Sequence, residues 1–434
     1  MTFLVVLVGL IVFLILGMPM FSGMLLFSSA IVLGVKGSLG AMGEFVFGHV
    51  NSYLLVAIPL FMLMAEFMVR GKVVDDLYAA AHTMVRHLPG GLAIATVMAC
   101  AIFAAISGSS VATALTVGSI AIPQMLRYRY SRKTTFGVVA AGGTLGILIP
   151  PSLPMVLYAF VAETSIGALF MAGIVPGLML MTMFAAYAVV TEIRHERTLG
   201  PDFRRPPRAT VGEIVEAVRK SFWALTLPPF VLGGMYMGIF TATEAAATGA
   251  LYALVVAAFI YRTLTLALFF ECVLNAARTT AMLLLIVVGA GVFGHMLTVL
   301  RIPQQIVELV SHLDLSVYVF LAAVTVILIL LGLVLESLSI ILITTPIIVP
   351  VLVHLGIDKV WYGILLTITL EMALISPPVA LNLVVIKSLT KAPSTEIDKA
   401  AVPYLILMLL AIILLVAFPD IAMWLPRTIS NAGQ

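Results

Sequence analysis

The sequence predicts an all-α integral membrane protein that contains two inverted repeats. Of the 434 residues, 62% are hydrophobic and only 10% are charged, which is typical of a chain embedded in a bilayer. A single offset of 227 residues relates four pairs of prolines: Pro123 and Pro350, Pro150 and Pro377, Pro151 and Pro378, and Pro176 and Pro403. This shared offset indicates a duplicated unit, and internal repeats are common in secondary transporters.

Each half contains one apolar span that a pair of prolines interrupts. The first interruption lies in residues 142–155, which also hold three glycines, and the second lies in residues 371–382. Proline has no N–H and clashes with the carbonyl four residues earlier, so neither span can be a continuous helix. Free backbone groups that face lipid cost several kcal/mol each, so a break persists only beside protein or a wet cavity. We therefore predict a binding site at each break.

The first half, residues 1–191, is expected to contain five spans and one re-entrant hairpin. The predicted spans are 3–16, 20–35, 52–69, the broken span 134–162, and 167–191, with an amphipathic arm at 71–87. The hairpin covers 91–126, because its two apolar stretches, 92–105 and 111–126, are each too short to cross about 30 Å of hydrocarbon. Its tip is Ser107-Gly108-Ser109-Ser110, which we expect near the middle of the membrane.

The second half, residues 222–418, is expected to repeat this plan after a polar cytoplasmic linker, 192–221. The predicted spans are 222–240, 245–261, 279–299, the broken span 359–390, and 402–418, with an arm at 264–277 and a hairpin at 316–355. Glu336 and Ser337 lie near the tip of this hairpin. Five spans are an odd number, so the second half must be inverted relative to the first. Residues 419–434 form the tail.

The positive charges orient the chain. The chain has 23 Lys and Arg residues. If the N-terminus is outside, all of them lie in cytoplasmic segments except Lys36, Arg301, Lys359 and Arg427, in agreement with the positive-inside rule. No Lys or Arg precedes Lys36, so the apolar start lacks the basic region of a cleaved signal peptide and is expected to be the first span.

The hairpin tips and breaks offer polar backbone groups inside the membrane. The start of a half-helix exposes N–H groups that suit an anion, whereas a half-helix end offers carbonyls to a cation. Hard cations such as Na⁺ bind oxygen, which unwound backbone supplies without a buried charge. The alternative is that the tip serines only cap a helix and the proline pairs are only kinks. The candidate sodium ligands are Gly146, Leu148 and Pro151 beside Ser107 or Ser110, and Ala373, Ser376 and Val379 beside Gly332.

Two acids, Glu336 and Glu371, are expected near the membrane interior. An ionised carboxylate there is costly and usually functional, so each is a candidate cation ligand, proton carrier or substrate contact. The alternative is a carboxylate that bonds local backbone or serines. The two cysteines show no CxxC spacing and the seven histidines show no close pairing, so we assign them no site. The sequence has no Walker A, GxSxG or HExxH motif, and we expect no enzyme activity.

Four motifs resemble those of a known transporter family. They are ISGSSVATA (106–114), GGTLGILIPPS (142–152), GLVLESLSIILITTPIIVP (332–350) and EMALISPPVALNL (371–383). The chain resembles, over nearly its whole length, the large membrane subunit of the tripartite ATP-independent periplasmic (TRAP) transporters. The resemblance implies an elevator mechanism in which both hairpins and both broken spans move against a scaffold. It also implies a bacterial inner-membrane protein with both termini in the periplasm.

The resemblance further implies a coupling ion, a substrate class and partners. The coupling would be symport with two or more Na⁺ ions, and the substrate would be a small carboxylate such as a dicarboxylate or a sialic acid. The partners would be a small four-helix membrane subunit and a soluble periplasmic substrate-binding protein. By motif, the first sodium site falls on Ser107, Gly146, Leu148 and Pro151, and the second on Gly332, Ala373, Ser376 and Val379. Ser109 and Glu336 would face the substrate, and Ser110, Ser152 and Ser337 are further substrate candidates. Arg301 and Lys359 are candidates for docking the binding protein.

This sequence departs from the family pattern at a few positions. Glu336 stands where many relatives have Asp, Ala373 and Ala380 stand where Gly is common, and Ser376 replaces Thr. Ala373 and Ala380 still offer their backbone carbonyls, and Ser376 retains the hydroxyl group that threonine would supply. Two other functions stay open at this point: a one-component sodium-coupled dicarboxylate carrier of related inverted-repeat fold, and a channel or membrane scaffold without coupled transport.

Overall fold

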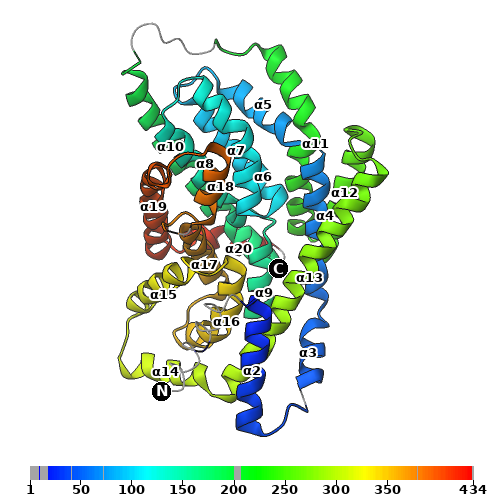
Figure 1. The fold of residues 1–434 in the computed structure, drawn as a ribbon, viewed down its shortest axis with the longest axis vertical. Coiled ribbons are helices and arrows are strands. Elements are labelled where there is room, and N and C mark those ends of the chain that lie inside the picture. Colours follow the sequence, from blue (N-terminus) through cyan, green and yellow to red (C-terminus); the bar gives the residue numbers. More distant parts are fainter. Residues whose placement is uncertain are drawn as a thin grey trace.

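The computed structural model describes residues 9, 18–40, 42–71, 73–199, 207–378 and 380–432, and all secondary structure within these ranges is helical (Figure 1). The first half contains α2 (Met20–Lys36), α3 (Met42–Val50), the 3₁₀ turn η1 (Tyr53–Val56), α4 (Ala57–Arg70), α5 (Val73–Val85), α6 (Gly91–Ser107), α7 (Ser110–Arg127), α8 (Arg132–Leu148), α9 (Leu153–Ala162) and α10 (Ile166–Glu196). The predicted span 3–16 lies outside the described residues, apart from Gly9.

Among the described residues the second half contains ten α-helices, one more than the first half. They are α11 (Val211–Tyr236), α12 (Ala242–Val255) with the π-helical turn η2 (Val256–Ile260), α13 (Leu266–Val299), α14 (Ile302–His312), α15 (Val317–Gly332), α16 (Ser337–His354), α17 (Lys359–Leu374), α18 (Leu381–Thr390), α19 (Ser394–Ala417) and α20 (Asp420–Ala432). The prediction of an all-helical chain is therefore confirmed over the described residues.

The helix boundaries recur at the offset that the prolines predict. Adding 227 to the bounds of α7 gives the bounds of α16, and the bounds of α8 and α9 fall within one residue of those of α17 and α18. Pro123 and Pro350 lie at the same position within α7 and α16. Both breaks contain a cis Pro–Pro bond. The recurrence agrees with a duplicated unit, and the inverted orientation of the two halves stays a prediction.

The predicted second arm at 264–277 is wrong. This stretch forms the first half of α13, which continues without a break for 34 residues. The counterpart of α5 at the offset of 227 is instead α14, a short amphipathic helix. In the first half, the segment equivalent to α13 is divided into α3, η1 and α4, because Asn51 and Ser52 interrupt it and Pro59 begins the next helix. Residues 264–299 contain no proline, so nothing stops the helix there.

Six helices within the described residues have the length and apolar composition to cross a bilayer, and the bent pair α8–α9 raises this number to seven. We predicted ten spans. One of these seven is α16, which we predicted as part of a hairpin, so six of the ten predicted spans are among them. Of the other four, span 3–16 lies outside the described residues apart from Gly9, α17 and α18 are separated by residues 375–380, α11 has a charged first half, and α2 has only 17 residues. The angle between α8 and α9 is 40°, which confirms that this span is broken.

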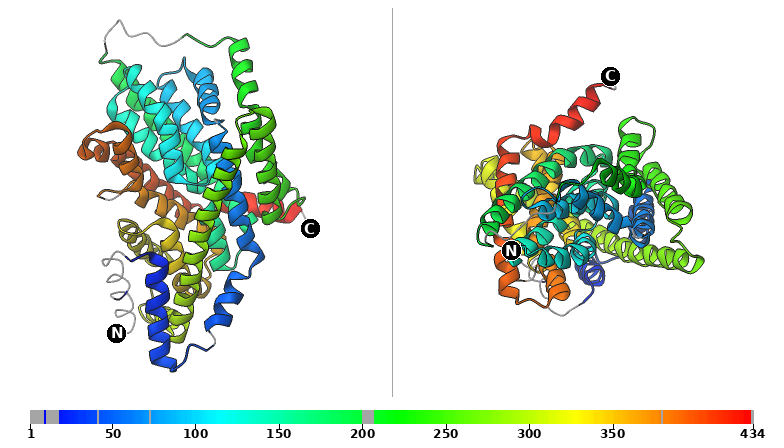
Figure 2. Two further views of the ribbon diagram at one scale, coloured as in Figure 1. Left: turned by 45° about the vertical axis from the view of Figure 1, so that its right-hand side comes forward. Right: turned by 90° about the horizontal axis from the view of Figure 1, so that it is seen from above.

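The two broken spans form the centre of the molecule. Every residue of α8 from Thr134 to Leu148 is buried, as is nearly every residue of α17. The hairpin helices α6 and α7 pack against α8, and α15 and α16 pack against α17. The linker leaves this bundle at one end, whereas α2, α3 and α14 lie at the other end (Figure 1). The C-terminal α20 projects from the side of the bundle (Figure 2).

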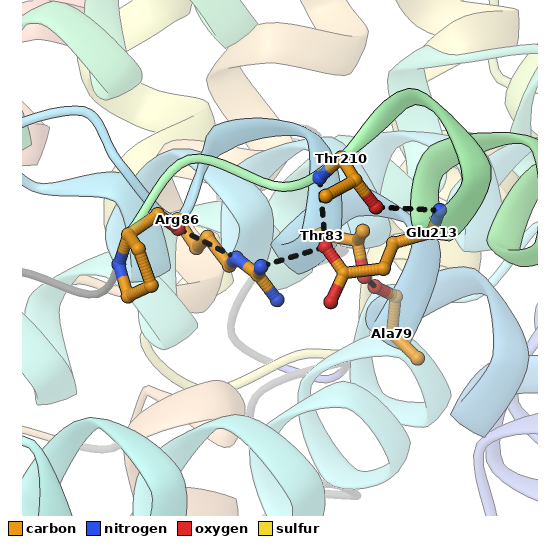
Figure 3. Close-up of polar contacts among 6 residues, drawn as sticks. Ala79, Thr83, Arg86, Thr210 and Glu213 are labelled. Atoms are coloured by element: carbon orange, nitrogen blue, oxygen red, sulfur yellow. Dashed lines mark hydrogen bonds and ion pairs between the residues drawn. The ribbon is translucent and has the colours of Figure 1, made fainter.

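The C-terminal end of the linker is attached to α5. The Arg86 guanidinium donates one hydrogen bond to the Pro207 carbonyl at 2.9 Å and another to the Glu213 carboxylate at 2.8 Å (Figure 3). The same carboxylate accepts the Thr210 N–H at 2.8 Å, while the Thr210 hydroxyl accepts the Glu213 N–H at 3.3 Å. This reciprocal capping box starts α11. Arg86 therefore ties the first helix after the linker to the arm of the first half.

Candidate functional site

The first hairpin tip is a two-residue link between α6 and α7. Gly108 takes the left-handed conformation, with φ of 59°, which glycine adopts without steric cost. Ser109 caps α7, because its hydroxyl accepts the Ala112 N–H at 3.4 Å. The Ser107 hydroxyl lies 3.1 Å from that of Thr113, which in turn donates to the Ser109 carbonyl at 2.7 Å. One tip serine is thus a cap, as the alternative reading allowed, while Ser107 and Ser110 do not cap a helix.

The first tip lies directly against the first break. A β-carbon at Gly108 would lie 3.0 Å from the Pro151 carbonyl oxygen, and one at Gly146 would lie 2.6 Å from the Ser109 carbonyl oxygen. Only glycine at these two positions lets the backbones approach so closely. The structure therefore brings Gly146, Pro151 and the tip segment that contains Ser107 into one small region. Their carbonyl and hydroxyl oxygens are the ligands that a hard cation prefers.

Two other candidate site residues of the first half, Leu148 and Ser152, are surrounded differently from Gly146 and Pro151. The Leu148 carbonyl oxygen would lie 2.7 Å from a β-carbon at Gly173, so it sits against α10. The Ser152 hydroxyl is buried and has no hydrogen-bond partner among the described residues. A buried hydroxyl without a partner costs about 1–3 kcal/mol, which makes Ser152 available to a bound ligand or water.

The second tip likewise contacts the second break. A β-carbon at Gly332 would lie 2.3 Å from that of Ala373, so the end of α15 meets the end of α17. The Ser376 hydroxyl donates to the Met372 carbonyl at 2.8 Å and keeps its oxygen lone pairs for another partner. Ser337 is buried at the start of α16. Val379, the remaining candidate, lies outside the described residues.

One residue that we did not single out joins the two halves. The Asn382 amide nitrogen donates to the Ser110 hydroxyl at 2.8 Å and lies 3.4 Å from the Ala140 carbonyl. Asn382 is fully buried, and its amide oxygen has no partner among the described residues. An asparagine four residues after the second proline pair, at the start of an apolar helix, is the signal that could have identified it.

The two candidate acids differ in burial. Glu371 is fully buried within α17, and neither carboxyl oxygen has a hydrogen-bond partner that meets standard geometry among the described residues, although the Leu148 backbone faces it. Glu336 is exposed and does not cap α16. Glu371 is thus enclosed by protein and Glu336 is open at the second tip, while the position of both acids near the membrane interior stays a prediction.

The two candidate docking cations also differ. Arg301 is exposed at the start of α14. Lys359 is half-buried, and its ammonium group donates to the Ala162 carbonyl at 2.9 Å, at the C-terminal end of α9. The Lys359 carbonyl in turn accepts the Tyr158 hydroxyl at 2.7 Å. Lys359 thus joins the two broken spans, which leaves Arg301 as the docking candidate with a free side chain.

Comparison with known proteins identifies the family of this chain. The model of the "Tripartite ATP-independent periplasmic transporter, DctM component" family matches residues 7–421. The chain belongs to the DctM family. The resemblance of the four motifs to TRAP large subunits is thereby confirmed.

Individual DctM relatives cover nearly the whole chain. The C4-dicarboxylate TRAP transporter large permease protein DctM of Pseudomonas aeruginosa is 41% identical over 92% of each chain. The sialic acid TRAP transporter large permease protein SiaM of Vibrio cholerae is 31% identical over 96% of this chain and 97% of that protein. The relatives therefore share one architecture while their names give different acids as cargo.

The DctM fold is also similar to a solved transporter. The Alcanivorax borkumensis YdaH transporter covers 90% of this chain and 88% of its own at a TM-score of 0.65 and 14% sequence identity. At this identity the likeness concerns the fold. The DctM family comprises transporter permeases of the membrane, which places the chain among transport proteins and indicates no catalytic function.

Proposed function

We propose that this chain is the large membrane subunit of a three-component transporter in which the inward movement of sodium ions drives the uptake of a small organic carboxylate. The observation that carries the proposal is the pairing of a hairpin tip with a broken helix in each half. Gly108 and Gly146 bring the first tip against Pro151, and Gly332 brings the second tip against Ala373. Each pairing gathers backbone carbonyls and a serine hydroxyl without a basic residue, which suits Na⁺.

The substrate would bind between the two tips. The starts of α7 and α16 carry Ser110 and Ser337, and the free N–H groups of these helix starts suit a carboxylate. The Asn382 amide holds the Ser110 hydroxyl, so the second broken span sets the position of the first tip. The P. aeruginosa relative carries C4-dicarboxylate in its name, so succinate is the substrate to test first.

The family description is tripartite, so two further components would act with this chain. We propose that they are a small four-helix membrane subunit and a soluble binding protein that delivers the acid. Arg301 is a candidate contact for an acidic patch on that protein. The one-component alternative makes a different prediction, since such a carrier would need no partner.

Sodium-driven uptake by proteoliposomes tests the proposal. We expect succinate uptake to require a sodium gradient and both partners, and to be negligible with this chain alone. Ser107→Ala and Ser376→Ala should each raise the sodium concentration for half-maximal uptake. The loss of one hydroxyl ligand costs about 1–2 kcal/mol, which corresponds to roughly a fivefold to thirtyfold weaker apparent affinity.

Ser311→Ala is the matched control. Ser311 is exposed on α14, away from both breaks, so this variant should keep the wild-type sodium dependence. Full uptake by the chain without partners would favour the one-component carrier. Uptake driven equally well by a proton gradient in the absence of sodium would overturn the sodium assignment.

A further inference from the structure

A cavity lies away from the tips and breaks. It has a volume of about 1040 Å³ and lies between α3, η1, α9, α13 and α16, toward the end of the molecule opposite the linker (Figure 1). None of the tip and break residues described above lines it. By the positive-inside count, this end faces the periplasm. The volume is sufficient for a small organic molecule with its hydration water.

Two histidines distant in sequence meet in this cavity. The Phe45 ring contacts both, with its centroid 5.8 Å from that of His49 and 4.8 Å from that of His295. Phe160 of α9 also contacts His49, edge to face, at 5.1 Å between ring centroids. Both imidazoles line the cavity, and no hydrogen bond joins either ring to another of the described residues. Each ring therefore keeps an N–H donor for a ligand.

Gly291 of α13 leaves room in the cavity for the His49 ring. A β-carbon at Gly291 would lie 2.6 Å from His49 Cδ2 and 3.0 Å from His49 Nε2, so any other residue at this position of α13 would displace the imidazole. Gly294, one turn further, also lines the cavity. Gly291 thus leaves room for the His49 ring, and the Phe45 and Phe160 rings pack against it.

Neutral hydrogen-bond donors in the lining, and a cation outside it, could attract an anion. Lys36, at the end of α2, is close enough to act electrostatically on His295. Asn51 adds an amide to the lining. The acid of the lining is Glu163, which is exposed at the end of α9. A ligand with two carboxylates could accept the N–H of each imidazole and lie within the field of Lys36.

We propose that this cavity is an outer entry site that holds a small dicarboxylate through His49 and His295 before the acid reaches the hairpin tips. The dicarboxylate class rests on the proposed function, whereas the site itself rests on the cavity, the two unpaired imidazoles and the glycines beneath them. The site would hold the acid after its release from a binding protein. It would also shorten the path to the tips, because α9 and α16 form a wall of the cavity and each continues toward a break or a tip.

Protection of a cysteine from a thiol reagent tests the entry site. Ser52 lines the cavity, and the native Cys100 and Cys272 are buried, so Ser52→Cys supplies a reporter in the full chain in nanodiscs. Without sodium, saturating potassium succinate should slow modification by a charged thiol reagent roughly tenfold, compared with potassium chloride of equal ionic strength. Adding His49→Gln and His295→Gln should abolish the protection. His312→Gln, exposed on α14 at the same end, should leave it unchanged.

The outcomes separate this inference from the proposed function. No protection by succinate in the parent, or equal protection in the double histidine variant, overturns the entry site. Loss of protection in Ser107→Ala would show that the reporter senses the tips instead of the cavity, and would also overturn it. Sodium-driven uptake is measured separately, so protection without such uptake contradicts only the proposed function, and uptake without protection contradicts only the entry site.

Discussion

At the scale of single residues, a substitution is less easily accommodated at a glycine that contacts backbone than at one of the candidate serines. A β-carbon at Gly146 would lie 2.6 Å from the Ser109 carbonyl oxygen and 2.9 Å from the Ser110 backbone nitrogen. Neither of these atoms belongs to a flexible side chain that could move aside. The tip or α8 would have to shift, and a shift of even a few tenths of an ångström alters every carbonyl near the break.

We therefore expect Gly146→Ala to reduce succinate uptake at least tenfold and to lower the thermal midpoint of the purified protein. Overpacking of this kind costs about 1–3 kcal/mol. Gly233→Ala is the matched control, because Gly233 lies in α11 with no heavy atom within 4 Å of the added β-carbon. That change should be neutral or slightly stabilising, since alanine favours helix. Equal uptake by the two variants would contradict a close contact between the tip and the break.

At the scale of helices, the local features were predictable and the distant contacts were not. Proline pairs and glycines act on their own backbone, so the breaks at Pro150 and Pro377 could be located from sequence. The hydrogen bond between Asn382 and Ser110 joins positions 272 residues apart. The sequence around either residue gives no indication of which residue it contacts. The same holds for His49 and His295, which Phe45 brings together.

Continuity of α13 shows a second limit of local patterns. The stretch 264–277 is amphipathic and predicts an arm, yet no proline or glycine separates it from the following span. Amphipathicity indicates which face is buried, whereas only a helix-breaking residue indicates where a helix ends. The equivalent first-half segment is interrupted at Asn51 and Ser52. The two halves therefore differ here, although an exact repeat would give the same helix in both.

The attachment of the linker to α5 should depend on pH. The hydrogen bond from the Thr210 N–H and then the Arg86 charge lower the pKa of Glu213 below its ordinary value of 4.5. A carboxyl group with a lowered folded-state pKa stabilises the fold above its ordinary pKa and loses this effect as the pH falls through the lowered value. A spin label at Arg208→Cys should therefore be immobile at about pH 6 and become mobile only below pH 4.5.

Variants separate this attachment from a general effect of acid. Glu213→Ala removes the carboxylate that accepts the Thr210 N–H and pairs with Arg86, so the label should be mobile at every pH. Glu216→Ala removes an exposed acid that pairs only with Lys220 among the described residues, and it should behave like the parent. A label that is equally immobile in Glu213→Ala would show that other contacts hold the start of α11.

At the scale of the whole molecule, the arrangement of charges fixes the expected orientation in the membrane. The linker end and the α14 end lie at opposite ends of the bundle (Figure 1). We expect a cysteine at Arg208 to resist an impermeant thiol reagent in intact spheroplasts, and a cysteine at Ser311 to react. Both positions are exposed, and the native cysteines are buried and should give little background. Labelling in the opposite sense would reject the positive-inside assignment for this chain.

The elevator mechanism makes a mechanical prediction about two helices in contact. In that mechanism α16 moves with the second tip, whereas α13 belongs to the scaffold, so their contact must slide in each cycle. A β-carbon at Gly294 would lie 3.8 Å from that of Pro346, which equals the mean separation of about 3.8 Å between β-carbons in disulfides. Gly294→Cys combined with Pro346→Cys should therefore form a disulfide under mild oxidation, without a large change in the backbone.

Closing this disulfide should arrest succinate uptake, and reduction should restore it, because a covalent bond permits no sliding between α13 and α16. Each single cysteine variant under the same oxidant is the control and should transport at its unoxidised rate. The crosslink yield is read by mass spectrometry, so unchanged uptake can be compared with the fraction of closed disulfide. If fully crosslinked protein transports at the rate of the reduced protein, then α13 and α16 move as one body, and transport must depend on a smaller motion at the tips and breaks.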